Sequence, residues 1–103
     1  MKIIVFITTA DKKQAGEIAS ALVGKGLAAC VNIIPKIDSI FTWKNKLEKA
    51  QECLLLVKSK KSLMPKLIKL VKSLHSYSVP EIIAIPIIAG NKDYLTWLDE
   101  STR

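Results

Sequence analysis

The chain is poor in several residue types on which common functions depend. Its 103 residues include one histidine (His75), one arginine (Arg103) and two cysteines (Cys30 and Cys53). No hydrophobic run approaches the ~20 residues of a membrane-spanning helix, and the first residues, MKIIVFITTAD, hold too short an apolar stretch for a signal peptide. We therefore expect a cytoplasmic protein with no membrane partner and no disulfide.

The scarcity of arginine also limits what the net charge of +7 can mean. Nucleic-acid readers favour arginine, because its guanidinium group makes bidentate and stacked contacts. Lys66, Lys69 and Lys72 recur at helical spacing opposite an apolar stripe, a pattern typical of a solvated helix face. We predict no nucleic-acid partner.

Aliphatic residues, in contrast, are plentiful. Half of the chain is hydrophobic, although only 6% of it is aromatic. A chain of this length is expected to form one domain, residues 1–103. The hydrophobic content exceeds what a small monomer needs, which predicts a buried interface between chains.

The hydrophobic pattern predicts four strands and three helices. Short apolar and β-branched runs predict strands at residues 2–8, 27–43, 52–58 and 81–88, the second interrupted near Pro35. Apolar stripes of helical period predict helices at 11–24, 61–74 and from 91 onward. Asp11 with Gln14 has the pattern of a capping box, and Ser62 and Asn91 are the predicted N-caps of the other two helices.

This order, β-α-β-β-α-β followed by a C-terminal helix, is the split β-α-β arrangement of ferredoxin-like proteins. We therefore expect an α+β fold with an antiparallel sheet. Asn45 tolerates positive φ and is predicted to turn the chain between the second and third strands. Pro86 is predicted to keep the fourth strand at an edge of the sheet.

Several uses of this fold require groups that the chain lacks. An RNA-recognition motif needs aromatic residues on its third strand, which here reads ECLLLVK. A copper chaperone would carry Cys-x-x-Cys after the first strand, where this chain has TTADKK. An acylphosphatase needs an arginine for the phosphoryl oxygens, and GKG ends a helix instead of opening one as a phosphate loop does. Both cysteines lie in apolar strand patterns, which are typical of buried structural thiols.

The segment LHSYSVPEIIAIP concentrates the polar candidates. It holds His75, Tyr77 and Glu81, and locally it is a helix-to-strand connection. Glu52 and Lys58 on the third strand fall on one face by the period of two, which allows a polar cluster in a cleft. A structural ion pair between Lys58 and Glu81 is favoured over catalysis, since no activated nucleophile accompanies the pair.

Five short motifs follow one another along nearly the whole chain. They are LAACVNI (27–33), Trp43 with Lys46 and Glu48, ECLLLVK (52–58), HSYSVPE (75–81) and YLTW (94–97). In this order and spacing they resemble the divalent-cation tolerance protein family, CutA. The resemblance implies a very stable homotrimer in which long hairpins pair between subunits. It also implies a role in the tolerance of copper and other divalent metals, without a defined catalytic reaction.

The chain departs from this family in its metal ligands. Members known for copper binding combine the histidine with a second histidine just before it and with a thiol on the first strand. Here those positions hold Leu74 and either Ile7 or Thr8. The resemblance therefore leaves His75 as the candidate metal ligand, and predicts weak binding of Cu²⁺ or another divalent ion with no obligatory cofactor.

Three functions stay open at this point. The first, which the resemblance supports, is a metal-responsive trimeric binding protein. The second is a signalling or scaffold trimer that holds a small ligand in an intersubunit cleft. The third is an enzyme that would use His75 with polar residues of that cleft, and we predict no such activity. The candidate residues of the cleft are Trp43, Glu52, Lys58, Tyr77 and Glu81.

Overall fold

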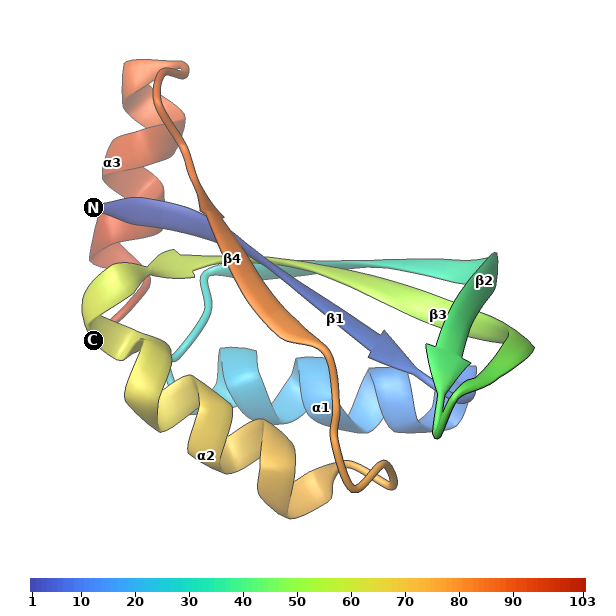
Figure 1. The fold of residues 1–103 in the computed structure, drawn as a ribbon. Helices are drawn as coiled ribbons and strands as arrows, with labels where there is room; N and C mark the ends of the chain where they lie inside the picture. Colours follow the sequence, from blue (N-terminus) through green and yellow to red (C-terminus); the bar gives the residue numbers. More distant parts are fainter.

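A computed structural model describes all 103 residues and shows the predicted order of strands and helices (Figure 1). The elements are β1 (Lys2–Thr9), α1 (Lys12–Gly24), β2 (Cys30–Trp43), β3 (Lys46–Lys60), a 3₁₀ turn η1 (Lys61–Leu63), α2 (Met64–Leu74), β4 (Ile82–Pro86) and α3 (Lys92–Glu100). The strands form one antiparallel sheet in the order β2-β3-β1-β4. The α+β, ferredoxin-like fold is thus confirmed.

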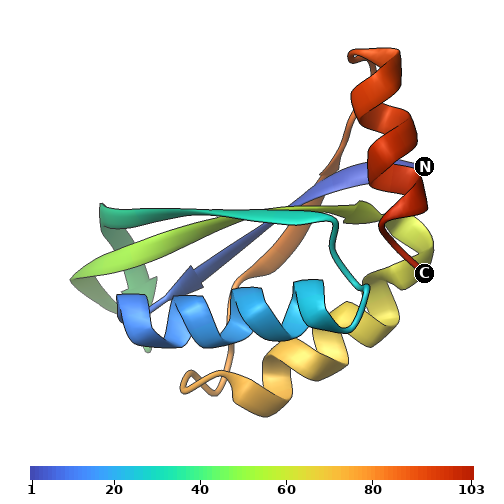
Figure 2. The same ribbon diagram turned by 180° about the vertical axis from the view of Figure 1, so that it is seen from behind.

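The core lies between the sheet and the two longer helices, which run side by side across one of its faces (Figures 1 and 2). The inward side chains of β1 alternate with outward ones, as the period of a strand requires. The fully buried core side chains come from two strands and two helices: Val5, Ile7, Leu55, Val57, Ile18, Leu22, Leu67 and Val71. Lys66, Lys69 and Lys72 lie on the outer side of α2, as the sequence pattern indicated.

The opposite face of the sheet is apolar as well, and α1 and α2 leave it uncovered. Register places Phe6 of β1 beside Leu56 of β3 and Ile83 of β4, all on this face. Ile83 is 56% exposed and its neighbour on the same face, Ile85, is 48% exposed. An apolar surface of this kind marks an interaction site more often than a free surface.

The helix caps agree with the sequence in two cases of three. The Asp11 side chain accepts a hydrogen bond from the Gln14 backbone N–H (2.8 Å), and the Asn91 side chain accepts one from Asp93 N–H (3.0 Å). The reciprocal half of the predicted capping box was wrong, because Gln14 Oε1 accepts from the Ser76 hydroxyl (3.1 Å) instead of from the Asp11 N–H. The predicted cap at Ser62 was also wrong, since this residue lies inside η1 and α2 begins at Met64 without a side-chain cap.

The strand bounds differ from the predicted ones where tertiary contacts intervene. Residues 27–29 lie outside β2, because the N–H groups of Leu27 and Ala28 donate to Leu22 O and so complete the end of α1. β3 extends beyond 52–58 in both directions, and β4 is shorter than 81–88. Pro86 ends β4, which is an edge strand as predicted.

The hairpin of β2 and β3 contains a bulge that changes which side chains share a face. Ile34 pairs with Leu54, but Ile37 pairs with Glu52, so β2 holds one residue more than β3 in this interval. The extra residue lies at Pro35, which has no N–H for the ladder, as the predicted interruption indicated. Beyond it, Trp43 pairs with Lys46 and shares a face with the even-numbered residues of β3. We call this distal part of the hairpin, residues 37–52, the arm.

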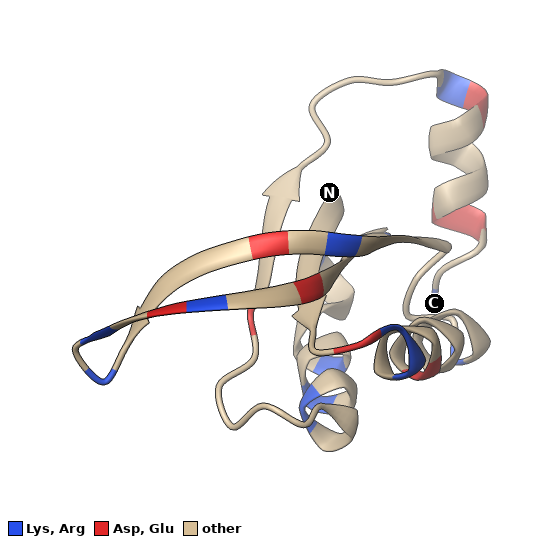
Figure 3. Ribbon diagram, turned by 90° about the vertical axis from the view of Figure 1, so that its right-hand side faces the viewer, with Lys and Arg blue, Asp and Glu red and all other residues tan.

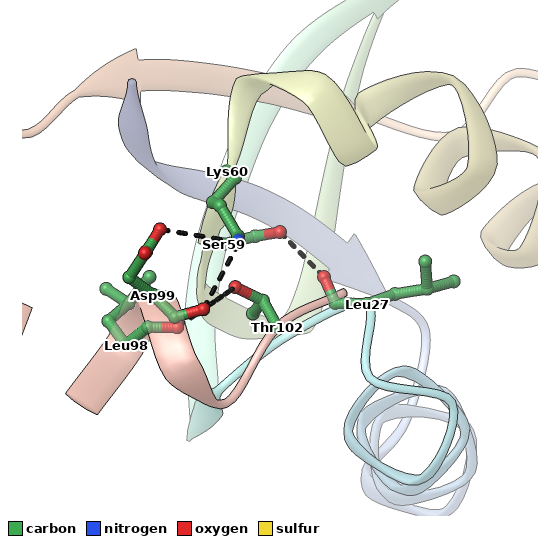
Figure 4. Close-up of polar contacts among 6 residues, drawn as sticks. All are labelled: Leu27, Ser59, Lys60, Leu98, Asp99 and Thr102. Atoms are coloured by element: carbon green, nitrogen blue, oxygen red, sulfur yellow. Dashed lines mark hydrogen bonds and ion pairs between the residues drawn. The ribbon is translucent and has the colours of Figure 1, made fainter. Parts of the chain in front are cut away.

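The C-terminal helix α3 contacts the C-terminal end of β3 (Figure 4). Lys60 Nζ lies 3.4 Å from Asp99 Oδ1 and donates to Asp99 O at 3.2 Å. Next to it, Ser59 Oγ donates to Leu27 O (2.6 Å), and Thr102 Oγ1 donates to Leu98 O (3.0 Å). The two contacts between Lys60 and Asp99 hold α3 at the end of the sheet opposite the arm.

Candidate functional site

A hollow of about 780 Å³ lies between the arm and the segment that joins α2 to β4. Its lining combines aromatic and acidic side chains. The aromatic residues are Phe41, Trp43 and Tyr77, and the acidic residues are Glu48, Glu52 and Glu81. This volume lies within the range of small-molecule sites.

The pairing of the arm places its aromatic residues on the wall of this hollow. Phe41 pairs with Glu48, and Ile37 pairs with Glu52, so odd residues of β2 here share a face with even residues of β3. The two-residue turn at Lys44 and Asn45 sets this pairing. The extra residue at Pro35 joins it to the proximal part of the hairpin, where even residues of β2 share a face with even residues of β3.

Tyr77 and Glu52 connect the two walls of the hollow. The Tyr77 hydroxyl donates to Glu52 Oε2 at 2.8 Å, and Glu52 is only 8% exposed. Burial raises the pKa of Tyr77 to about 12, with further contributions from the hydrogen bond to Glu52 and from its charge. The phenol therefore remains protonated and acts as a hydrogen-bond donor.

Because its pKa is raised, ionisation of Tyr77 should lower the free energy of unfolding in strongly alkaline solution. A tyrosine in an unfolded chain ionises near pH 10, whereas the folded pKa of Tyr77 is about 12. Its contribution is therefore complete below about pH 10 and is lost as the pH rises through about 12. Tyr77→Phe should flatten the decline of the unfolding free energy between these values, measured by urea denaturation. A decline as steep as that of the wild type would contradict the assignment.

His75 links the segment that carries Tyr77 to the end of β1 through two hydrogen bonds. Its Nδ1 accepts a hydrogen bond from the Tyr77 N–H (3.0 Å), and its Nε2 lies 2.7 Å from Thr8 O. Because Nδ1 accepts, the proton is on Nε2, which donates to the carbonyl. Both nitrogens are thus in use, and His75 lies outside the lining of the hollow. No three side chains of His, Cys, Asp or Glu gather closely enough to hold a metal ion.

Lys58 is the predicted cleft residue that the chain does not bring to the hollow. It lies on the same face of β3 as Glu52, as predicted, but six residues along the strand correspond to about 20 Å. Its Nζ contacts Asn32 Oδ1. The expected ion pair between Lys58 and Glu81 was wrong, since the ion pair of this chain joins Lys60 to Asp99.

The other four predicted cleft residues, Trp43, Glu52, Tyr77 and Glu81, do line one hollow. Sequence reasoning did not identify Phe41 as a fifth. Glu48 stood out only as part of a family motif. The signal that could have found both was the turn at Lys44 and Asn45, because a two-residue turn there pairs Phe41 with Glu48.

Comparisons with known proteins agree on one family. A family model described as CutA1 divalent ion tolerance protein matches residues 3–101. The divalent-cation tolerance protein CutA of Thermus thermophilus is 50% identical over 102 residues, which make up 99% of each chain. Protein CutA of Mus musculus is 48% identical over 95% of this chain, which spans only 55% of that longer protein.

Solved structures give the same result. The structure of the divalent cation tolerance protein Cut A1 from Thermus thermophilus has a TM-score of 0.98 and 50% identity, with both chains fully covered. CutA1 of Oryza sativa has a TM-score of 0.96 and 43% identity over 99% of this chain and 94% of that one. None of the helices here is long and apolar enough to cross a membrane. With a family model over almost its full length and relatives near 50% identity, this chain belongs to the CutA1 divalent ion tolerance protein family.

Proposed function

We propose that this chain works in divalent-cation tolerance as a homotrimeric binding protein that holds a small ligand in its hollow and catalyses no reaction. The observation that carries the proposal is the lining of the hollow. Aromatic surfaces and a few polar groups that converge on one cavity are the usual composition of a ligand site, and here Phe41, Trp43 and Tyr77 face three carboxylates.

The same lining offers no activated nucleophile. It includes no cysteine, lysine or histidine. Tyr77 is bonded to a carboxylate, but its raised pKa keeps the phenol protonated. Covalent catalysis needs the opposite, a nucleophile whose proton is easily removed.

The homotrimer is supported by the apolar sheet face that α1 and α2 leave uncovered. Burying Phe6, Ile83 and Ile85 against other chains would remove this surface from water, and pairing at β2 or β4 would satisfy edge-strand backbone groups. The number of three comes from the resemblance to the CutA family. A cytoplasmic location suits the two cysteines, both of which are free thiols. We propose neither a nucleic-acid nor a membrane partner.

Divalent metals are a second proposed ligand, with His75 as the contact. An imidazole nitrogen is a good ligand for Cu²⁺ and Zn²⁺. At His75, however, a metal must compete with the Tyr77 N–H for Nδ1 or with Thr8 O for Nε2. Binding should therefore be weak, not required for folding, and lost as the pH falls, because a protonated imidazole cannot ligate a metal.

One titration series tests both ligands. Small organic compounds, Cu²⁺ and Zn²⁺ are titrated against the wild type, Glu52→Gln and His75→Ala, with calorimetry as the measurement. Organic ligands that pair with the Glu52 carboxylate should bind less tightly to Glu52→Gln than to the wild type, and metals should bind less tightly to His75→Ala. Circular dichroism without ligand shows whether each variant is folded.

The two parts of the proposal can fail separately. A panel in which no organic compound binds the wild type would refute the hollow as a ligand site. Equal metal affinity in the wild type and His75→Ala would remove His75 as a ligand and leave it with the structural role that its two hydrogen bonds define.

A further inference from the structure

We propose that the hollow selects an organic ammonium cation, a positively charged amine carried on an apolar body. This inference rests on the proposed function of the hollow as a ligand site, and it adds the chemical class of the ligand.

The charge of the lining is opposite to that of the chain. Sixteen residues are basic and nine acidic, yet the charged side chains that line the hollow are all glutamates. Figure 3 shows basic residues at the tip of the hairpin, along both of its strands and on the helices, but Lys36 and Lys49, on these strands, are not among the residues that line the hollow. The hollow is therefore an acidic region on a basic protein, and a cation is the ligand that it attracts.

The aromatic residues indicate what kind of cation fits. Three of the six aromatic residues of the chain line this one hollow. Phe41 is 42% exposed and Trp43 is 46% exposed, so parts of both rings are open to a ligand. Aromatic faces attract ammonium groups, most strongly in the case of tryptophan, and they also pack against hydrocarbon.

One oxygen of the Glu52 carboxylate is free to accept a cation. This carboxylate is more than nine-tenths buried, and its Oε2 accepts the bond from Tyr77. Its other oxygen has no hydrogen bond or ion pair within the chain. Since no side-chain oxygen of the chain is both buried and without a partner, this oxygen is accessible, and a cation in the hollow would find it free to pair.

A bare metal ion does not suit this arrangement. Glu48 and Glu52 lie four residues apart on β3, which corresponds to about 13 Å. Metal ligands must converge to about 2.0–2.6 Å from a single ion, and no group of three potential ligands does so anywhere in the chain. Carboxylates spread along a wall instead suit a ligand of several atoms.

The test compares probes of one shape and different charge. Choline is the cation, 3,3-dimethylbutan-1-ol is its neutral isostere, and 3,3-dimethylbutanoate is an anion of similar body. Each is titrated at constant ionic strength into the assembled protein carrying Trp97→Phe, so that Trp43 is the only tryptophan whose fluorescence is followed. Choline should bind about tenfold more tightly than the alcohol. Long-range attraction to a protein of net charge +7 favours the anion, so it cannot produce this preference.

Two further variants test whether Glu52 causes the preference for choline over the alcohol. Glu52→Gln keeps an acceptor for the Tyr77 hydroxyl but removes the charge, and should lower choline affinity about tenfold while leaving the alcohol unchanged. Asp38→Asn is the matched control: Asp38 is on the opposite face of the same arm, and its replacement should change neither affinity.

The outcomes that overturn the inference differ from those that refute the ligand site. Equal binding of choline and the alcohol, tighter binding of the anion, or unchanged choline affinity in Glu52→Gln would each overturn the cation class and leave a ligand site in place. A failure of choline to bind would also overturn it. Only a hollow that binds none of the organic compounds would refute the proposed function as well.

Discussion

Lysines in place of both Ile83 and Ile85 are expected to convert the proposed homotrimer into monomers. The two side chains pair with Phe6 and Ile4 across β4 and β1, on the sheet face that α1 and α2 leave uncovered. If this face is buried between chains, each lysine places an unpaired charge in an apolar interface, at a cost of several kcal/mol. Native mass spectrometry at micromolar concentration should show three chains for the wild type and one for the variant.

A control separates the interface from a general effect of added charge. Val23 on α1 is also exposed, at 45%, but lies on the helical side of the molecule, and Val23→Lys should remain a trimer. A wild type that is a monomer would refute the proposed assembly. A double lysine variant that stays trimeric would place the interface elsewhere.

The second large effect is expected in the core. Leu55 lies in the inner strand β3, is fully buried, and belongs to the cluster that packs under α1 and α2. Leu55→Ala removes buried hydrocarbon and leaves a cavity, which should lower the free energy of unfolding by about 2–5 kcal/mol per chain.

Urea denaturation followed by circular dichroism measures this loss, with all variants at the same chain concentration because assembly also adds stability. Leu47 on the arm is 68% exposed, and Leu47→Ala should change stability by no more than about 0.5 kcal/mol in either direction. Equal losses in the two variants would contradict the assignment of the core.

The fold was predictable because its signals are local. Hydrophobic periodicity reports which face of each helix and strand is buried, and the caps at Asp11 and Asn91 involve residues two or three positions away. The absence of a side-chain cap at Ser62 could not be predicted in this way. Lys61 N–H donates to Met1 O, so the chain enters α2 from a position fixed by the first strand.

The candidate site was predictable only in part, because periodicity gives a face and not the place of a hollow on it. It correctly placed Lys58 on the face of Glu52, and six residues of strand already put the two about 20 Å apart. What it could not show is that the hollow lies at the Glu52 end of this face. His75 posed a different problem. The carbonyl that its ring contacts belongs to Thr8, 67 residues earlier in the chain, and only the folded structure brings them together.

The single extra residue at Pro35 has a consequence for how this hairpin can change in evolution. Removing it would leave the pairs from Ile37–Glu52 to Trp43–Lys46 in place, because the two-residue turn at the tip fixes them, and the same side chains would stay on the wall of the hollow. What would be lost is the local bend and the stronger twist that a bulge gives to a strand. Relatives that lack the extra residue should therefore keep the same lining and differ in the direction in which the arm leaves the sheet.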